Sequence, residues 1–192
     1  MSLFKGCATA LITPFKDGKI DYVSMGKIVE MQIKENIDAL VVCGTTGWDI
    51  EAIRQEATKR EVGLIWSSNY SIGVNILFAI NRQLAKLMAV YSDYTPHLTE
   101  VHHIHKLDAP SGTAKTLQEV IGEERLPLRS IESIREGEVA GIHTVVWDSE
   151  VDTISISHSA KTRKGFALGA VIAAEWLKGK NGFHTMQEVL GV

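Results

Sequence analysis

Residues 100–114 have the sequence EVHHIHKLDAPSGTA, and this stretch decides the expected fold of the larger, C-terminal part of the chain. It predicts the end of a strand near His97–His105, then a Pro-Ser-Gly-Thr turn, then a helix over Thr113–Ile121. The histidines and the lysine can bind or transfer protons. A helix start that contains glycine favours a bound carboxylate or phosphate. The stretch therefore predicts chemistry on a small acidic molecule.

The segment before residue 70 has the alternation of an α/β fold. Gly6–Thr13 and Ala39–Cys43 are apolar runs typical of buried strands, and a helix over Asp21–Asn36 begins at a capping residue. This order predicts a parallel βαβ unit. A second helix, capped by Asp49, and a strand over Gly63–Ser67 continue the pattern.

The pattern changes after residue 70. A long helix over Ile72–Tyr91 precedes the quoted stretch, and two strands over Gly141–Asp148 and Asp152–His158 follow it, before a last helix over Gly165–Leu177. The predicted fold class is α/β plus α+β: a partial Rossmann-like parallel sheet with a C-terminal mixed-sheet lobe for substrate binding and oligomerisation. We expect domains over residues 1–69, 70–164 and 165–192, with the last helix packing back on the first lobe.

Composition narrows the functional classes. The chain has 192 residues, 45% of them hydrophobic and 22% charged, which is the balance of an ordinary globular protein. A net charge of −3 with scattered Lys and Arg argues against a nucleic-acid partner, and no apolar run is long enough to span a membrane. Cys7 and Cys43 lie in apolar segments, which favours free thiols and a cytoplasmic location.

The histidine run allows two geometries. In a regular strand His102 and Lys106 share one face while His103 and His105 share the other. If the strand end bends, His102, His103 and Lys106 converge on one pocket, where they can protonate and hold a bound anion. A sheet edge followed by a capped helix is the alternative without function. We predict no metal site, because the His103-x-His105 pair has no acidic or thiol ligand at a supporting spacing.

Two further loops can face a ligand. Gly44-Thr45-Thr46-Gly47 follows a predicted parallel strand, at the end where open α/β sheets bind ligands, although a simple glycine turn explains it equally well. The turn over Ser67–Tyr70 also ends a strand and is expected to flank the same cleft. No G-x-G-x-x-G loop is present near the N-terminus. We expect His143 and His158 to be ordinary sheet residues and His184 to be solvated.

Taken together, these motifs resemble those of 4-hydroxy-tetrahydrodipicolinate reductases from about Gly44 to the C-terminus. The resemblance rests on residues 102–114, on Gly44-Thr45-Thr46-Gly47-Trp48, on Ser68-Asn69-Tyr70-Ser71-Ile72-Gly73-Val74-Asn75, and on Phe166-Ala167-Leu168-Gly169-Ala170-Val171. It implies reduction of a cyclic unsaturated dicarboxylate by NADH or NADPH in lysine biosynthesis. It also implies a homo-oligomer, by family a tetramer.

The resemblance assigns roles residue by residue. His102 is expected to be the proton donor and acceptor and Lys106 a second proton donor, while His103 and the backbone of Gly112 and Thr113 hold the substrate carboxylates. The expected cofactor-binding residues are Gly44, Thr45, Thr46, Ser67, Ser68, Asn69, Tyr70 and Arg163.

The first 43 residues are similar instead to the opening of 4-hydroxy-tetrahydrodipicolinate synthase, from Leu3-Phe4-Lys5-Gly6 to Val42-Cys43-Gly44-Thr45-Thr46-Gly47. The chain is thus an apparent chimera with a junction at 44–47, and the glycine-rich cofactor loop of the reductases is missing. We expect a reductase-type enzyme with weak or absent turnover. The alternative is a non-catalytic chimeric or truncated chain that retains dicarboxylate binding and oligomerisation.

Overall fold

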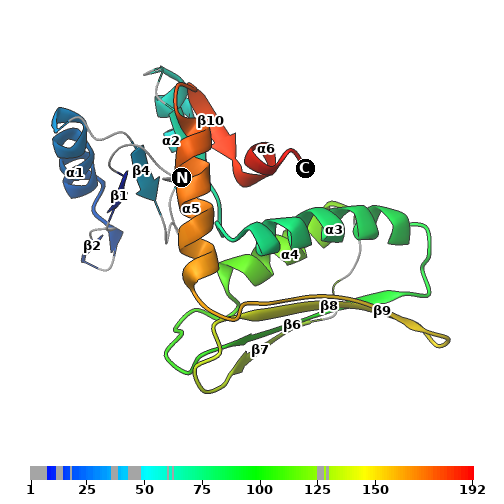
Figure 1. Ribbon diagram of the computed structural model, residues 1–192. Coiled ribbons are helices and arrows are strands. Elements are labelled where there is room, and N and C mark those ends of the chain that lie inside the picture. The colour runs from blue at the N-terminus through cyan, green and yellow to red at the C-terminus, as the bar shows by residue number, and fades with distance from the viewer. Residues whose placement is uncertain are drawn as a thin grey trace. The chain divides into compact units, whose positions relative to one another are not determined.

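The computed structural model describes residues 8–11, 15–17, 19–35, 39–42, 49–59, 61, 63–124, 128 and 130–192 (Figure 1). The chain forms two compact units, one from residues 1–70 with 167–191 and the other from residues 71–166 with Val192. The mixture of parallel pairs in the first unit and a mixed sheet in the second confirms the predicted fold class.

The first unit begins with the predicted βαβ arrangement. Strand β1 (Ala8–Leu11) pairs in parallel with β4 (Ala39–Val42), and helix α1 (Tyr22–Lys34) connects them. Asp21 caps α1, since its carboxylate accepts a hydrogen bond from the Ser24 backbone N–H at 3.0 Å. Two short strands, β2 (Phe15–Lys16) and β3 (Lys19–Ile20), form an antiparallel pair between β1 and α1.

The rest of the first unit is built on a second parallel pair. Strand β5 (Gly63–Trp66) pairs with β10 (Gly182–Thr185), next to helices α2 (Ile50–Lys59), α5 (Lys164–Leu177) and α6 (Met186–Leu190). We had not predicted β10, and the expectation that His184 is solvated was wrong. His184 lies in β10, its ring packs edge-on against Trp176 at 5.1 Å, and its side chain is 17% exposed. Apolar residues of β5, α5 and α6 form the core of this unit.

The second unit is a four-stranded sheet of order β7-β6-β8-β9 with two helices on one face (Figure 1). Its strands are β6 (Thr95–His102), β7 (Ile131–Arg135), β8 (Ile142–Asp148) and β9 (Thr153–Ser159), and its helices are α3 (Ile72–Met88) and α4 (Gly112–Glu123). Strand β7 is parallel to β6, and the other neighbours are antiparallel. We had expected only charged turns where β7 lies. None of the described helices has the length and apolar character needed to cross a membrane.

Alternate residues of β6 and β8 face the helices and are buried. At one end of this face Leu98, Val145 and Trp147 pack with α3 and α4 in an apolar core. Full burial of each such side chain stabilises the fold by roughly 1.5–3 kcal/mol. At the other end of this face, the same alternation buries Glu100 and His102. The helix-covered face therefore changes from apolar to polar along the strands, and the polar end holds the candidate site.

Candidate functional site

A row of polar side chains crosses the sheet at the polar end. Glu100 of β6 lies opposite Ser133 of β7 on one side and His143 of β8 on the other, and His143 in turn lies opposite His158 of β9. Glu100 is fully buried. We had not predicted a role for Glu100, although its position two residues after Leu98 in an alternating strand is a signal of burial.

The Glu100 carboxylate is bound by the guanidinium of Arg135 and by the backbone at the start of α4. The Ser111 backbone N–H donates to both carboxylate oxygens at 3.1 Å, and Nη2 of Arg135 donates to Oε1 at 3.2 Å. Burial raises the pKa of the Glu100 carboxyl, but hydrogen bonds from Ser111, Ser133 and Arg135 outweigh it and hold the pKa below its usual range. Glu100 is therefore an anion at neutral pH.

His102, the expected proton-transfer residue, lies beside this anion. Its Nδ1 is 3.6 Å from Oε2 of Glu100, and its ring packs edge-on against the ring of His143 at 4.9 Å. Burial lowers the pKa of His102 most strongly. The Glu100 charge raises the pKa and the Lys106 charge lowers it, and the net shift is downward. His102 is thus neutral at physiological pH and can accept a proton.

His143 is a buried, neutral member of the same cluster. Its Nε2 lies 3.2 Å from the Ser111 hydroxyl oxygen and 3.7 Å from Oε2 of Glu100. Burial, with repulsion from His102 in its protonated form as the next cause, lowers the pKa of His143 to about 4. His143 does lie within a strand, as expected, but it is also part of the site, which the sequence did not reveal.

Ser111 connects the cluster to helix α4. It is the N-cap residue, and its hydroxyl oxygen accepts a hydrogen bond from the Ala114 backbone N–H at 3.2 Å. Gly112 and Thr113, the residues expected to bind substrate carboxylates, form the first turn of this helix. The positive end of a helix dipole favours an anion there.

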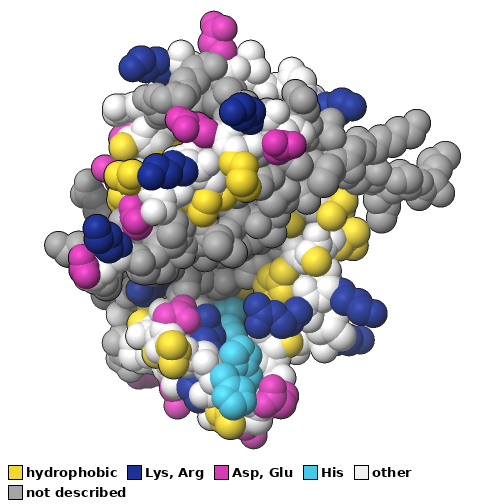
Figure 2. Space-filling view, turned by 90° about the vertical axis from the view of Figure 1, so that its left-hand side faces the viewer, with side chains coloured by type: hydrophobic (Ala, Val, Ile, Leu, Met, Phe, Trp, Pro, Cys, Tyr) yellow, Lys and Arg dark blue, Asp and Glu magenta, His cyan; other side chains and the backbone are white. Residues whose placement is uncertain are grey.

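Strand β6 ends at His102, so the predicted strand over His97–His105 was too long at its C-terminal end. Of the two geometries considered for the histidine run, the regular strand over residues 102–106 is therefore excluded. The chain turns instead, and the Lys106 backbone N–H donates to the His103 carbonyl oxygen at 3.1 Å. Figure 2 shows histidine side chains gathered in a strip on the surface, with Lys or Arg side chains beside it.

Arg135 holds the loop that carries Lys106. Its guanidinium donates to the carbonyl oxygens of Lys106 and Asp108 as well as to Glu100. The Lys106 ammonium in turn lies 2.7 Å from Oδ1 of Asp108. Burial raises the pKa of Asp108, but the hydrogen bond and charge of Lys106 outweigh it and lower the pKa. Arg135 was not foreseen either, because β7 was not predicted.

The expected cofactor residues are placed only in part. Gly44, Thr45 and Thr46 lie outside the described residues. In the first unit, a turn over Ser67–Tyr70 follows β5. The Ser67 hydroxyl donates to the Asn69 carbonyl oxygen at 2.6 Å, and the buried Tyr70 hydroxyl donates to the Ile65 carbonyl oxygen at 2.9 Å. In the second unit, Arg163 is exposed just before α5.

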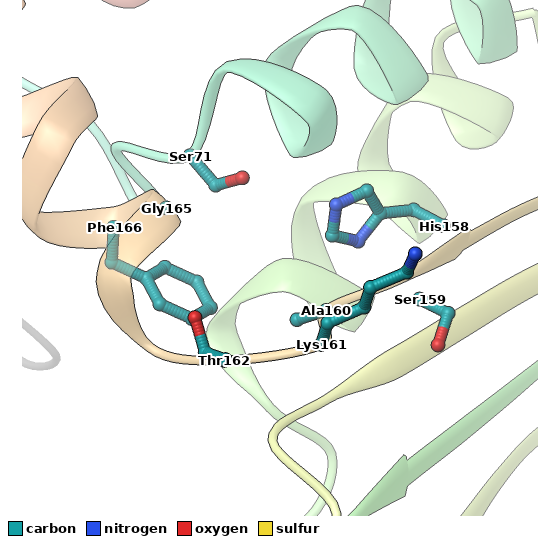
Figure 3. Close-up of a pocket in the computed structure, with 8 residues that line it drawn as sticks. All are labelled: Ser71, His158, Ser159, Ala160, Lys161, Thr162, Gly165 and Phe166. Carbon is teal, nitrogen blue, oxygen red and sulfur yellow. The ribbon is translucent and has the colours of Figure 1, made fainter.

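A pocket of about 220 Å³ lies at the β9 end of the polar row (Figure 3). It is lined by Ser71, the N-cap of α3, by His158, and by the segment over residues 159–162, which includes Lys161. Burial lowers the pKa of His158. The pocket thus combines hydroxyl, imidazole and ammonium groups, which suit a small polar ligand.

Among the described residues, one group has ligand atoms close enough together to hold a metal ion. It consists of Glu100, His102 and His143, whose ligand atoms lie within 4.8 Å of one another. However, Glu100 already accepts hydrogen bonds from Ser111 and Arg135. The Arg135 charge opposes a cation at the same carboxylate. The geometry therefore fits a hydrogen-bonded cluster better than a metal centre.

Comparison with known proteins identifies the family. Residues 73–190 match the family model described as dihydrodipicolinate reductase, C-terminus. A 4-hydroxy-tetrahydrodipicolinate reductase of Christiangramia forsetii is 45% identical over 164 residues, which cover 78% of this chain and 69% of the relative. The chain belongs to the 4-hydroxy-tetrahydrodipicolinate reductase family. The reductase of Methanosarcina mazei is 37% identical over 208 residues, covering 98% of this chain and 78% of the relative.

The chain is also similar to a solved structure and to a second family. A dipicolinate-bound dihydrodipicolinate reductase from Paenisporosarcina sp. TG-14 has the same fold, with a TM-score of 0.63 at 19% identity, covering 88% of this chain and 70% of that structure. Residues 3–59 match the dihydrodipicolinate synthetase family. Both resemblances drawn from the sequence are thus confirmed. The synthetase match continues beyond the loop at 44–47, where we had expected the resemblance to change.

Proposed function

We propose that this chain is a reductase-type protein of lysine biosynthesis, located in the cytoplasm, that acts on a cyclic unsaturated dicarboxylate with NADH or NADPH. The observation that carries the proposal is the position of Glu100, which faces His102 and also binds the N-cap residue of α4. One carboxylate thus connects a proton-transfer group to a helix start suited to anions. The family membership and the dipicolinate bound to the solved relative support a dicarboxylate substrate.

The proposed roles follow from this arrangement. His102 first takes up a proton from solvent and then gives it to the ring carbon next to the one that receives hydride, and Lys106 is a second proton donor. His103 and the backbone of Gly112 and Thr113 hold the carboxylates. The Lys106 ammonium is paired with Asp108 at 2.7 Å, so it must exchange or share that partner when it meets a substrate carboxylate.

The nicotinamide cofactor would supply the hydride. We assign its binding to Gly44, Thr45, Thr46, Ser67, Ser68, Asn69, Tyr70 and Arg163. The turn over Ser67–Tyr70 fits this role because it follows a parallel strand and is ordered by its own hydrogen bonds. The polar atoms of this turn can contact the carboxamide of the nicotinamide. The ring of Tyr70 packs in the core of the first unit.

Turnover is expected to be weak or absent, because the N-terminal glycine-rich loop that binds the cofactor pyrophosphate in dinucleotide folds is missing. The synthetase-like match over residues 3–59 favours an alternative function. In that alternative the chain has lost hydride transfer but still binds the dicarboxylate through its second unit.

Two measurements separate these functions. Calorimetry is performed with pyridine-2,6-dicarboxylate and with NADH separately, and NADH oxidation is followed with the dihydrodipicolinate substrate. Binding of both ligands with slow oxidation supports the reductase, whereas binding of the acid alone supports the alternative. His102→Gln should abolish any oxidation, while His97→Gln, on the other face of β6, serves as the matched control. Failure to bind the dicarboxylate would contradict both functions.

We also propose that the chain forms a homo-oligomer, by family a tetramer. Helices α3 and α4 cover one face of the sheet, and Ile154 of β9 is 39% exposed. A partly apolar, uncovered strand is suited to pairing with another copy. Light scattering coupled to size exclusion would show a single monomeric species if this is wrong.

A further inference from the structure

We propose that Glu100 and His143 form a buried positioning pair: Glu100 fixes the ring tautomer of His102, and both residues hold Ser111 at the start of α4. The inference rests on the proposed function, because it concerns the groups to which proton transfer and carboxylate binding are assigned there. Neither residue needs to touch the substrate. Both act through a neighbour.

Glu100 faces one ring nitrogen of His102. Nδ1 of His102 is buried, has no hydrogen-bond partner among the described residues, and lies 3.6 Å from Oε2 of Glu100. A lone pair on Nδ1 would face the negative carboxylate, whereas an N–H would present a positive hydrogen to it. Glu100 therefore favours the tautomer with hydrogen on Nδ1, which leaves the lone pair on Nε2.

Gly141 lies next to the other ring nitrogen of His102, Nε2. A Cβ atom on Gly141 would lie 3.2 Å from Nε2 of His102, so glycine leaves room that another residue would fill. Gly141 has φ +146°, a conformation that glycine adopts readily. A side chain at position 141 would therefore crowd the nitrogen that carries the lone pair. This is the nitrogen that would exchange a proton with substrate.

His143 contacts the side chain of Ser111. Nδ1 of His143 is buried without a hydrogen-bond partner among the described residues, while Nε2 lies 3.2 Å from the Ser111 hydroxyl oxygen. Nε2 also lies 3.7 Å from Oε2 of Glu100, so a hydrogen on Nε2 faces the negative carboxylate, and the neutral ring carries its hydrogen there and donates it to Ser111. Glu100 binds the Ser111 N–H at 3.1 Å. Ser111 is therefore held at its backbone by one residue and at its hydroxyl by the other.

The charges that face His102 come from several elements. Glu100 lies on its own strand, Lys106 and Asp108 on the following loop, Arg135 on β7, and the neutral His143 on β8. Without the Glu100 charge, the positive charges of Lys106 and Arg135 would oppose protonation of His102 more effectively. The pKa of His102 would then fall further.

Nuclear magnetic resonance of the ¹⁵N-labelled full chain tests the Glu100 step, because ring nitrogen shifts report the tautomer without any ligand. We expect the Nδ1–H form of His102 to dominate in the wild type. Glu100→Gln should shift the population toward the Nε2–H form and lower the pH at which His102 is protonated. Glu132→Gln, an exposed residue of β7, is the control. An unchanged tautomer and midpoint in Glu100→Gln would overturn the proposal.

A second comparison tests His143. His143→Leu removes the donor, whereas His143→Gln keeps an N–H at a similar reach. Amide exchange at Ser111 and Ala114 should accelerate at least about tenfold in His143→Leu, and dicarboxylate affinity should fall about tenfold, with both largely restored in His143→Gln. Equal behaviour of the two variants would refute the role. If His143→Leu does not fold, His143→Gln and the Glu100 comparison still test the positioning pair.

If the wild type binds no dicarboxylate, the proposed function fails. The tautomer and amide-exchange measurements need no ligand, so they still test the positioning pair.

Discussion

Replacing Arg135 by methionine should lower the free energy of unfolding by about 3 kcal/mol at pH 7. Removing one partner of a buried ion pair costs about 3–5 kcal/mol, because the remaining charge loses its compensation. Glu100 is fully buried and the Arg135 side chain is 19% exposed, which sets the expected cost at the lower end. Glu100 also keeps its two hydrogen bonds from the Ser111 N–H. Lysine at position 135 should recover little, since one ammonium cannot replace the planar guanidinium that also holds the loop carbonyls.

The assay is urea unfolding of the wild type, Arg135→Met, Glu100→Gln and the double variant. The double variant should be more stable than the sum of the single losses predicts, by at least about 1.5 kcal/mol, because it buries no unpaired charge. In the wild type, the lowered pKa of Glu100 contributes stability above its ordinary value of 4.5, and this is lost as the pH falls through the folded-state pKa. The cost of Arg135→Met should therefore shrink in acid. Additive losses within about 0.5 kcal/mol, independent of pH, would refute the reasoning.

Four further predictions follow from the same geometry. The pKa of His143 is about 4 in the folded state against an ordinary value of 6.5. The free energy of unfolding of the wild type should therefore fall by on the order of 3 kcal/mol as the pH falls from 6.5 to 4. His143→Gln should reduce this dependence on pH, measured by urea unfolding at a series of pH values. Gly141→Ala should destabilise the fold by about 1 kcal/mol or more and weaken pyridine-2,6-dicarboxylate binding in calorimetry, because its Cβ would approach Nε2 of His102. Ser111→Ala should cost about 1 kcal/mol as a lost helix cap, measured by thermal unfolding, whereas a neutral result would mean that Glu100 alone holds the helix start. Leu98→Ala should cost about 2–5 kcal/mol in urea unfolding without altering the His102 tautomer, because it opens a cavity at the apolar end of the sheet.

Most elements of the fold could be predicted from the sequence because local patterns specify them. The βαβ unit before residue 43, the two helices of the second unit and strands β8 and β9 all have clear apolar periodicity or capping residues. Strands β7 and β10 lack it. Strand β7 carries Glu132 and Arg135, and its strand character comes from pairing with β6, which is a long-range interaction.

Only those residues of the candidate site that lie within a recognisable sequence motif could be predicted. His102, His103, Lys106, Gly112 and Thr113 lie within one continuous stretch. Their partners do not: Glu100 precedes the motif and looks like an ordinary polar strand residue, while Arg135 and His143 lie on other strands. Register between strands decides which of these side chains meet, and register cannot be obtained from a single sequence. The assigned roles remain predictions that the experiments above address.

The strand order β7-β6-β8-β9 has a consequence for folding. Strand β6 lies between β7 and β8, although both follow it in the chain, so Glu100 meets Arg135 across 35 residues of sequence. A partly folded sheet containing β6 and β8 but lacking β7 would bury this carboxylate without its guanidinium, at a cost of several kcal/mol. We therefore expect such a species to be poorly populated. The buried charge thus favours cooperative assembly of β7, β6 and β8, and the site becomes complete in the same step that joins these three strands.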